Sequence, residues 1–175
     1  MATYTIDTAH SEITFKIRHL MITNVNGRFT KFEGKMITSS DDLTNAEIDF
    51  EADIDSINTN NEQRDGHLRT GDFFDAAQYP KLIFKSTSLE KQGGDVYKLN
   101  GNLTLHGVTK PITMSAEYGG ASNDFYGNSK IGFALSGSLH RKDYGLEWNA
   151  ALETGGVALS DEVKLMLDIQ LIKQA

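Results

Sequence analysis

The chain has 175 residues, and its 24 acidic side chains outnumber its 17 lysines and arginines, which gives a net charge of −7. This length suits one domain with a sizeable core, so we expect a single domain over residues 1–175. The acidic balance lacks the basic footprint of a nucleic-acid-binding protein. Because cysteine is absent, disulfide frameworks, thiolate metal sites and cysteine nucleophiles are excluded.

The sequence also bears on membranes and location. No apolar run approaches the roughly 18 residues needed to span a bilayer, so no transmembrane segment is expected. The first residues, Met1 to Asp7, have neither the basic start nor the apolar core of a signal peptide. As written, the sequence predicts a cytoplasmic protein, or a periplasmic one if it is a mature form.

Hydrophobic and polar residues alternate with a period of two along most of the chain, as in strands with one buried face. In chain order, the alternating segments are 13–17, 25–36, 46–54, a strand after Pro80, 97–105, 112–118, 131–139 and 163–171. About eight antiparallel strands in one domain predict an all-β barrel or sandwich.

The alternation changes register near Phe29. Gly27 and Phe29 share one parity, whereas Phe32 and Gly34 share the other. One extra residue at 30–31 would restore the inward face, so we expect a β-bulge there.

The inward positions decide what a barrel would hold. Several are small, such as Ala46 and Gly101, and others are aromatic. A barrel of eight strands is just wide enough to be filled by side chains or to hold one small ligand, and both outcomes stay open. Parity gives these candidate ligand contacts: Phe15, Ile17, His19, Phe29, Phe50, Phe84, Leu103, Met114 and Phe133. His19 falls at a strand end, where the role of a hydrogen-bonded core histidine is favoured over that of a ligand contact.

The longest interruption of the strand pattern, around residues 61–75, combines Arg64, Asp65 and His67 with the adjacent Phe73 and Phe74. A long loop in a compact domain is usually functional or disordered, and paired aromatics argue against disorder. We therefore expect an ordered flap with a short helix. Its polar and aromatic side chains, with Arg141 from a later turn, are the candidate residues of a lid and mouth.

Catalytic and metal-binding motifs are absent. The five histidines show no HxH, HxxxH or HExxH spacing, and no nucleophile elbow or phosphate-binding loop occurs, so no metal and no catalytic residue is expected. The alternative is a hydrolase or isomerase that uses Arg64, Asp65 and His67. A third interpretation is a filled barrel that serves as a stress-related scaffold for a protein partner.

The chain resembles the YceI-like family of lipocalin-like, polyisoprenoid-binding bacterial proteins. The resemblance rests on an ordered series of short motifs, which are DTAHS at 7–11, GRF at 27–29, RDGHL at 64–68, DFFD at 72–75, YP at 79–80, FKS at 84–86, GNLTLHGVT at 101–109 and RKDYG at 141–145. It implies an eight-stranded antiparallel barrel, extended relative to lipocalins, with a long apolar tunnel.

The resemblance further implies binding of a long isoprenoid or similar amphiphilic chain, of the quinone or polyprenyl type, without an enzymatic step. It also makes a homodimer plausible. We therefore expect a carrier or storage protein that needs no cofactor beyond a bound lipid or quinone.

Overall fold

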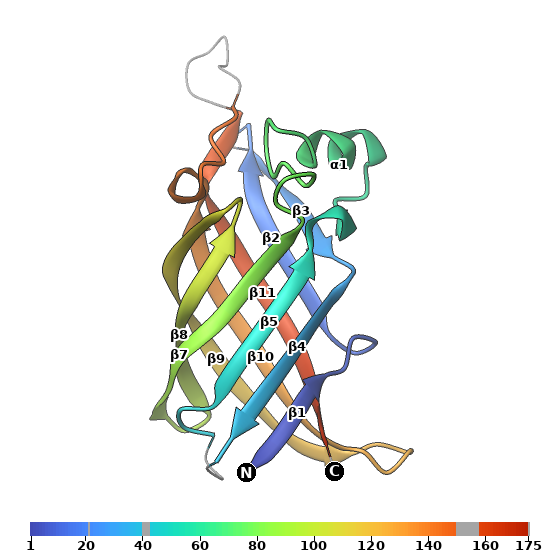
Figure 1. Ribbon diagram of the computed structural model, residues 1–175, viewed down its shortest axis with the longest axis vertical. Coiled ribbons are helices and arrows are strands. Elements are labelled where there is room, and N and C mark those ends of the chain that lie inside the picture. The colour runs from blue at the N-terminus through green and yellow to red at the C-terminus, as the bar shows by residue number, and fades with distance from the viewer. Residues whose placement is uncertain (21, 40–42, 150–157, 175) are drawn as a thin grey trace.

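The computed structural model describes residues 1–20, 22–39, 43–149 and 158–174, and most of them belong to antiparallel strands (Figure 1). The strands are β1 (Ala2–Ile6), β2 (Glu12–His19), β3 (Thr23–Phe29), β4 (Phe32–Thr38), β5 (Glu47–Asp53), β6 (Ile57–Asn58), β7 (Lys81–Gly93), β8 (Val96–Leu105), β9 (Val108–Asn123), β10 (Ser129–His140) and β11 (Leu159–Lys173). One α-helix, α1 (Glu62–Leu68), and two short 3₁₀ helices, η1 (Ile54–Ser56) and η2 (Arg141–Tyr144), complete the fold.

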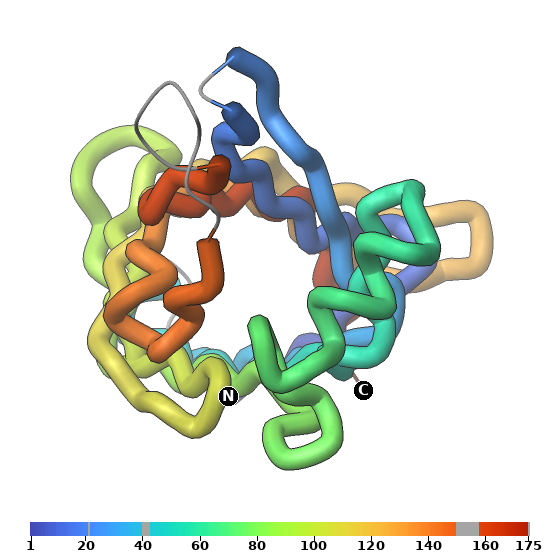
Figure 2. The backbone as a smooth tube through the Cα atoms, turned by 90° about the horizontal axis from the view of Figure 1, so that it is seen from above, coloured from blue at the N-terminus to red at the C-terminus, as the bar shows by residue number. Residues whose placement is uncertain are grey.

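The strands close into a barrel. Neighbours follow the order β1-β4-β5-β7-β8-β9-β10-β11, and β11 pairs back with β1, which makes a ring of eight strands. Seen from above, the backbone forms this ring (Figure 2). The short strands β2, β3 and β6 continue the sheet beyond β11. The predicted all-β barrel with a short helical flap is therefore confirmed.

The first part of the chain explains why eleven strands are found where eight were predicted. Both β1 and β2 pair with β11. Next to them, β4 pairs with β1 and β3 pairs with β2. In the same way, β5 then pairs with β4 and β6 pairs with β3. Three long strands are thus each interrupted once.

The β-bulge predicted at residues 30–31 was wrong in kind. Phe29 pairs with Ile57, and Phe32 pairs with Ala52. An advance of three residues from β3 to β4 is therefore matched by an advance of five residues from β5 to β6. The extra residues lie in the partner strand, which turns there as η1.

The change of parity itself is real, because residues 30 and 31 are both exposed between the partly or fully buried Phe29 and Phe32. The amide of Thr30 donates to the carbonyl of Ser56, and the amide of Asp53 donates to that of Lys31. The chain therefore bends at residues 30–31, and hydrogen bonds to the partner strand hold this bend. The extra residues belong to the partner strand.

The two ends of the barrel differ. At the upper end in Figure 1 lie α1 and the turn between β8 and β9, whereas both termini lie at the lower end. In that turn His106 and Gly107 have φ values of 55° and 74°, as a two-residue hairpin of type I′ requires. The Nδ1 atom of His106 donates a hydrogen bond at 3.0 Å to the carbonyl oxygen of Tyr144 in η2, and the His106 ring packs on Tyr79.

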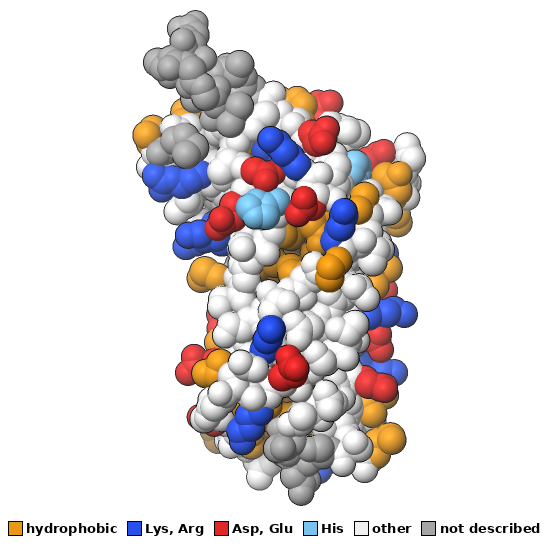
Figure 3. Space-filling model, turned by 90° about the vertical axis from the view of Figure 1, so that its left-hand side faces the viewer, with side chains coloured by type: hydrophobic (Ala, Val, Ile, Leu, Met, Phe, Trp, Pro, Cys, Tyr) orange, Lys and Arg blue, Asp and Glu red, His pale blue; other side chains and the backbone are white. Residues whose placement is uncertain are grey.

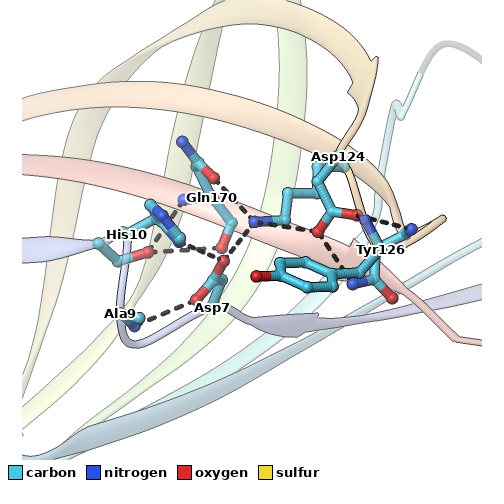
Figure 4. A network of polar contacts seen from close by, with 9 residues as sticks. Asp7, Ala9, His10, Asp124, Tyr126 and Gln170 are labelled. Atoms are coloured by element: carbon cyan, nitrogen blue, oxygen red, sulfur yellow. Dashed lines mark hydrogen bonds and ion pairs between the residues drawn. The ribbon is translucent and has the colours of Figure 1, made fainter.

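At the lower end, polar contacts fasten the loop between β1 and β2 to the hairpin between β9 and β10 (Figure 4). The ammonium of Lys130 lies 2.6 Å from a carboxylate oxygen of Asp7 and 3.7 Å from one of Asp124. The Asp7 carboxylate also contacts His10 at 2.9 Å. The motif at residues 7–11 is thus a structural joint.

Alternation separates the two faces of the barrel wall. Inward side chains form one continuous core that includes Met36, Leu89 and Leu99. The outer face seen in Figure 3 carries acidic and basic side chains interspersed over most of its height. Among the described residues, no helix has the length and apolar character to cross a bilayer.

Candidate functional site: an apolar cavity in the barrel

The barrel encloses a cavity of about 160 Å³ whose exposed surface is apolar throughout. Every strand of the closed ring contributes to it. Its wall is made by Ile6, Ile13, Thr14, Phe15, Phe29, Gly34, Lys35, Met36, Ile48, Asp49, Phe50, Leu82, Phe84, Leu89, Leu99, Leu103, Ile112, Met114, Ala116, Phe133, Leu135, Leu139, Leu165, Leu167, Ile169 and Leu171.

The cavity is elongated along the strands. On β11 alone its wall runs from Leu165 to Leu171, which spans about 20 Å at roughly 3.3 Å per residue. An extended hydrocarbon chain suits this shape better than a compact ligand does.

Glycines keep the cavity open by receiving large side chains against the wall. A Cβ atom added to Gly27 would overlap the ring of Phe15, and one added to Gly101 would overlap the ring of Phe84. Gly34 stands opposite Phe50 in the same way, at 3.4 Å. The small inward residues therefore complement large ones, as a filled barrel would require, yet the axis of the barrel stays empty.

Of the nine candidate ligand contacts, seven border this cavity: Phe15, Phe29, Phe50, Phe84, Leu103, Met114 and Phe133. The other two, Ile17 and His19, lie further along β2, where they pair with Val25 and Thr23 of β3. They share the inward parity but sit beyond the end of the cavity wall. Contact of any of the nine with a ligand stays a prediction.

The polar residues of the flap (residues 61–75) are engaged with the chain just before it. The buried carboxylate of Asp65 accepts hydrogen bonds from the amide of Thr59 at 2.9 Å and from its hydroxyl at 2.5 Å. The Arg64 guanidinium donates to the hydroxyl and carbonyl of the same Thr59, at 2.8 and 2.6 Å. Both side chains therefore fix the approach to α1, which begins after the cap residue Asn61.

The flap also takes the place of a neighbouring strand beside β6. The strand β6 pairs with β3 only. On its other side Arg69 donates to the carbonyls of Asp55 and Ile57, at 3.2 and 3.3 Å. These bonds satisfy backbone acceptors that an unpaired edge would leave exposed.

The two adjacent phenylalanines of the flap point to different partners. The Phe74 ring packs edge-on against Phe29 at 6.4 Å, and Phe29 packs on Phe15 at 5.7 Å. Because Phe29 and Phe15 border the cavity, Phe74 extends this aromatic row from the cavity wall into the flap.

Phe73 is held from the opposite side of the barrel end by a residue that sequence reasoning missed. The rings of His67, Phe73 and Trp148 pack on one another with centroid distances of 5.0 to 5.1 Å. His67 also contacts a carboxylate oxygen of Asp72 at 2.8 Å. Trp148 is the single tryptophan of the chain, a rarity that could have drawn attention to it.

Arg141 acts on the flap indirectly. Its buried guanidinium donates to the carbonyls of Leu146, Trp148 and Ser160, at 3.0, 3.1 and 3.0 Å. Burial lowers the pKa of Arg141, and the nearby Asp161 partly opposes this. Arg141 therefore positions the backbone of Trp148, whose ring meets the flap, and does not itself border the cavity.

This geometry does not assemble a catalytic group from the three residues of the enzyme alternative. Arg64 and Asp65 converge on Thr59, whereas His67 faces Asp72 and the two aromatic rings. In the described part of the chain, no group of three or more His, Asp or Glu side chains is arranged to hold a metal ion.

Several solved structures share this architecture. A YCEI protein of Campylobacter jejuni matches with a TM-score of 0.76 and 34% identity over 91% of each chain. BcnA of Burkholderia cenocepacia matches with a TM-score of 0.82 and 19% identity, covering 94% of this chain and 98% of that one. A domain of Saccharophagus degradans described as polyisoprenoid binding matches with a TM-score of 0.76 and 21% identity, covering 98% of both chains.

Sequence comparison reaches the same family. A UPF0312 protein of Staphylococcus aureus (strain N315) is 37% identical over 165 residues, which are 94% of each chain. One of Vibrio parahaemolyticus is 40% identical over 145 residues, 82% of this chain and 77% of the relative. The model of the YceI-like domain matches residues 4–171. Barrel, flap and sequence thus agree, and the chain belongs to the YceI-like family.

Proposed function

We propose that the protein binds one long apolar chain, such as the isoprenoid tail of a lipid, inside the barrel and carries or stores it. The observation that supports this most is the elongated cavity, whose apolar surface is supplied by every strand of the closed ring. A solvent-filled cavity of this character is unfavourable, because no polar wall atom is there to hold water.

Magnitudes favour retention of such a chain. Each CH₂ group moved out of water gains about 0.8 kcal/mol. Association and ordering together cost an estimated 4–15 kcal/mol. For a chain of some 20 carbons or more, the free energy gained therefore exceeds the cost of binding, whereas for a short hydrocarbon it does not. This arithmetic requires no charged anchor and no general base.

The relatives are consistent with this proposal. The domain of Saccharophagus degradans, which shares the fold, is described as polyisoprenoid binding. We carry the isoprenoid class over to this chain as part of the proposal, because a branched, flexible tail fits a cavity walled by both aromatic and aliphatic side chains.

We further propose that the flap is the lid of the cavity and carries out no chemical step. The Phe74 ring packs against Phe29 at the upper end of the cavity wall, and the Phe73 ring packs against Trp148. Arg64 and Asp65 are already hydrogen-bonded to Thr59, which leaves them a structural role. If His67→Ala abolished a hydrolytic or isomerising turnover of the bound lipid while binding persisted, the enzyme alternative would replace this proposal.

The direct test is to extract the purified protein with organic solvent, identify lipids by mass spectrometry, and measure uptake of a fluorescent apolar probe. Two neighbouring residues of β11 provide matched variants, because Leu167 borders the cavity and Met166 points outward with 51% exposure. We expect Leu167→Gln to lower probe uptake and Met166→Gln to leave it unchanged. Absence of both lipid and probe uptake in the folded wild type would refute the proposal.

A further inference from the structure

Three tyrosines lie on the inward face at the lower end of the barrel. Each has a direct cross-strand partner that borders the cavity: Tyr4 on β1 pairs with Met36, Tyr97 on β8 with Ala116, and Tyr118 on β9 with Phe133. Residues directly opposite each other in antiparallel strands share a face of the sheet. The three tyrosines therefore continue the cavity wall downward.

Their rings approach one another from different sides of the barrel. The Tyr118 and Tyr97 rings pack on Phe133 with centroid distances of 5.4 and 6.4 Å. The strand β1 lies across the ring from β8 and β9. The pKa of Tyr118 is raised, first by burial and then by Tyr4, Tyr97 and Asp95. Tyr4 shares the inward face of the wall with its partner Met36, as Tyr118 does with Phe133, so both side chains point into the interior.

The tyrosine hydroxyls are polar groups below an otherwise apolar cavity. No hydrogen bond from the described residues reaches the hydroxyl of Tyr4 or of Tyr118, and no fully buried side-chain oxygen or nitrogen lacks a partner among those residues. The two hydroxyls are therefore reachable by water. In the free protein water satisfies them, and a ligand group with the right acceptor can replace that water.

We propose that Tyr4, Tyr97 and Tyr118 form a tyrosine floor, in which the hydroxyls of Tyr4 and Tyr118 receive the polar end of the bound lipid and select a neutral head group with a carbonyl acceptor. A ketone, a quinone and an amide share this chemistry. The inference rests on the proposed function, since it assigns the orientation of the same ligand, with its head at the lower end and its tail towards the flap.

The tyrosines of the floor supply no positive charge for a phosphate head group. Burial keeps the Tyr118 phenol neutral, so that it donates one hydrogen bond and supplies no positive charge. The amide of Tyr118 donates to the carbonyl of Asp95, whose carboxylate repels an anion placed there. Two exposed lysines stand directly opposite tyrosines of the floor: Lys173 on β11 pairs with Tyr4, and Lys91 on β7 pairs with Tyr97. A phosphate would depend on these two lysines, whereas a carbonyl would depend on the phenols.

The experiment compares three ligands of equal chain length: octadecane, 2-octadecanone and octadecyl phosphate. Each displaces a fluorescent apolar probe from the wild type, Tyr4→Phe, Tyr118→Phe and the double variant. Tyr126→Phe is the matched control, because it removes the same hydroxyl from a residue that is 89% exposed on the β9–β10 hairpin. Thermal unfolding of each variant verifies that it is folded.

We expect 2-octadecanone to bind the wild type roughly three- to tenfold better than octadecane, the effect of one net hydrogen bond. Tyr118→Phe and Tyr4→Phe should reduce this ratio, the double variant should abolish it, and Tyr126→Phe should preserve it. Affinity for octadecane should be the same in all variants.

Two results would overturn the inference while leaving the proposed function intact. One is a ratio of ketone to alkane affinity that is the same in the double variant as in the wild type. The other is tightest binding of octadecyl phosphate, lost in Lys173→Met or in Lys91→Met. Failure of both the apolar probe and octadecane to bind the wild type would instead refute the proposed function, and the tyrosine floor with it.

Discussion

The tip of the Phe15 ring lies over Gly27, its direct cross-strand partner, in the space that a Cβ atom at residue 27 would occupy. This single missing side chain decides where an aromatic ring goes. With glycine opposite, the ring rests on the wall of the barrel. With any larger residue, it must swing towards the axis, where the cavity is.

Gly27→Ala should therefore narrow the cavity. The methyl group displaces the Phe15 ring inward, which lowers uptake of an apolar probe and destabilises the fold by about 1–3 kcal/mol, as overpacking usually does. Adding Phe15→Leu to this variant should restore part of the probe uptake and part of the lost stability. Gly71→Ala is the control, because a Cβ there meets no atom within 4 Å. Unchanged uptake in Gly27→Ala would contradict the role given to this pair.

Period-two alternation was enough to predict an all-β barrel or sandwich and its inward faces, and the resemblance to the family implied the closed barrel. The alternation placed Phe50 and Phe133 at the cavity because burial on one face imposes that pattern locally. It could not tell how far along β2 the cavity extends, since Ile17 and His19 show the same parity as Phe15. Where a cavity ends depends on which side chains meet across the barrel, and no local pattern records that.

Trp148 escaped prediction for a related reason. No periodicity marks residues 141–149, and the position of its ring follows from hydrogen bonds between Arg141 and backbone carbonyls. The assignment of Arg141 to the mouth stays a prediction, and the sequence could not show that its guanidinium acts through the main chain. Nor could it show that the extra residues near Phe29 belong to the partner strand.

The contact between Phe73 and Trp148 can be followed by fluorescence, because Trp148 is the only tryptophan. Phe73 is 6% exposed and its ring lies 5.0 Å from that of Trp148. We expect Phe73→Leu to shift the emission to longer wavelength, to speed release of a bound probe and to lower the unfolding free energy by about 1–2 kcal/mol. Phe125→Leu, at a fully exposed hairpin position, should change none of these.

Arg141→Lys should loosen the same contact from its other side. One ammonium cannot reproduce three hydrogen bonds to the carbonyls of Leu146, Trp148 and Ser160, so buried acceptors lose their donor at a cost of about 1–3 kcal/mol each. We expect urea unfolding to show a loss of about 2–4 kcal/mol and the Trp148 emission to shift. The neighbouring Lys142→Met serves as control, because only the backbone of Lys142 is bonded, to Asp161. Equal stability of the two variants would show that Arg141 does not hold this segment.

The hairpin between β9 and β10 should weaken in acid. The pKa of Asp124 is lowered from 3.8 to about 2 by hydrogen bonds from the side chain and amide of Asn128, helped by the amide of Tyr126 and the charge of Lys130 (Figure 4). The pKa of Asp7 is also lowered: burial opposes the shift, but hydrogen bonds from Lys130 and His10 outweigh it.

A carboxyl group whose pKa is lower in the folded state favours folding when the pH is above its unfolded value. That contribution is then lost as the pH falls through the folded value. For Asp124 the window runs from 3.8 down to about 2. Between pH 5 and pH 2, the free energy of unfolding measured with urea should therefore fall more steeply in the wild type than in Asp124→Asn. This variant keeps a hydrogen-bond acceptor but has no charge to lose. Ser129→Ala, which removes only an uncharged hydrogen bond to Asn123 in the same hairpin, should keep the wild-type slope. An Asp124 carboxyl that titrates near 4 by NMR would show that the joint does not hold its charge.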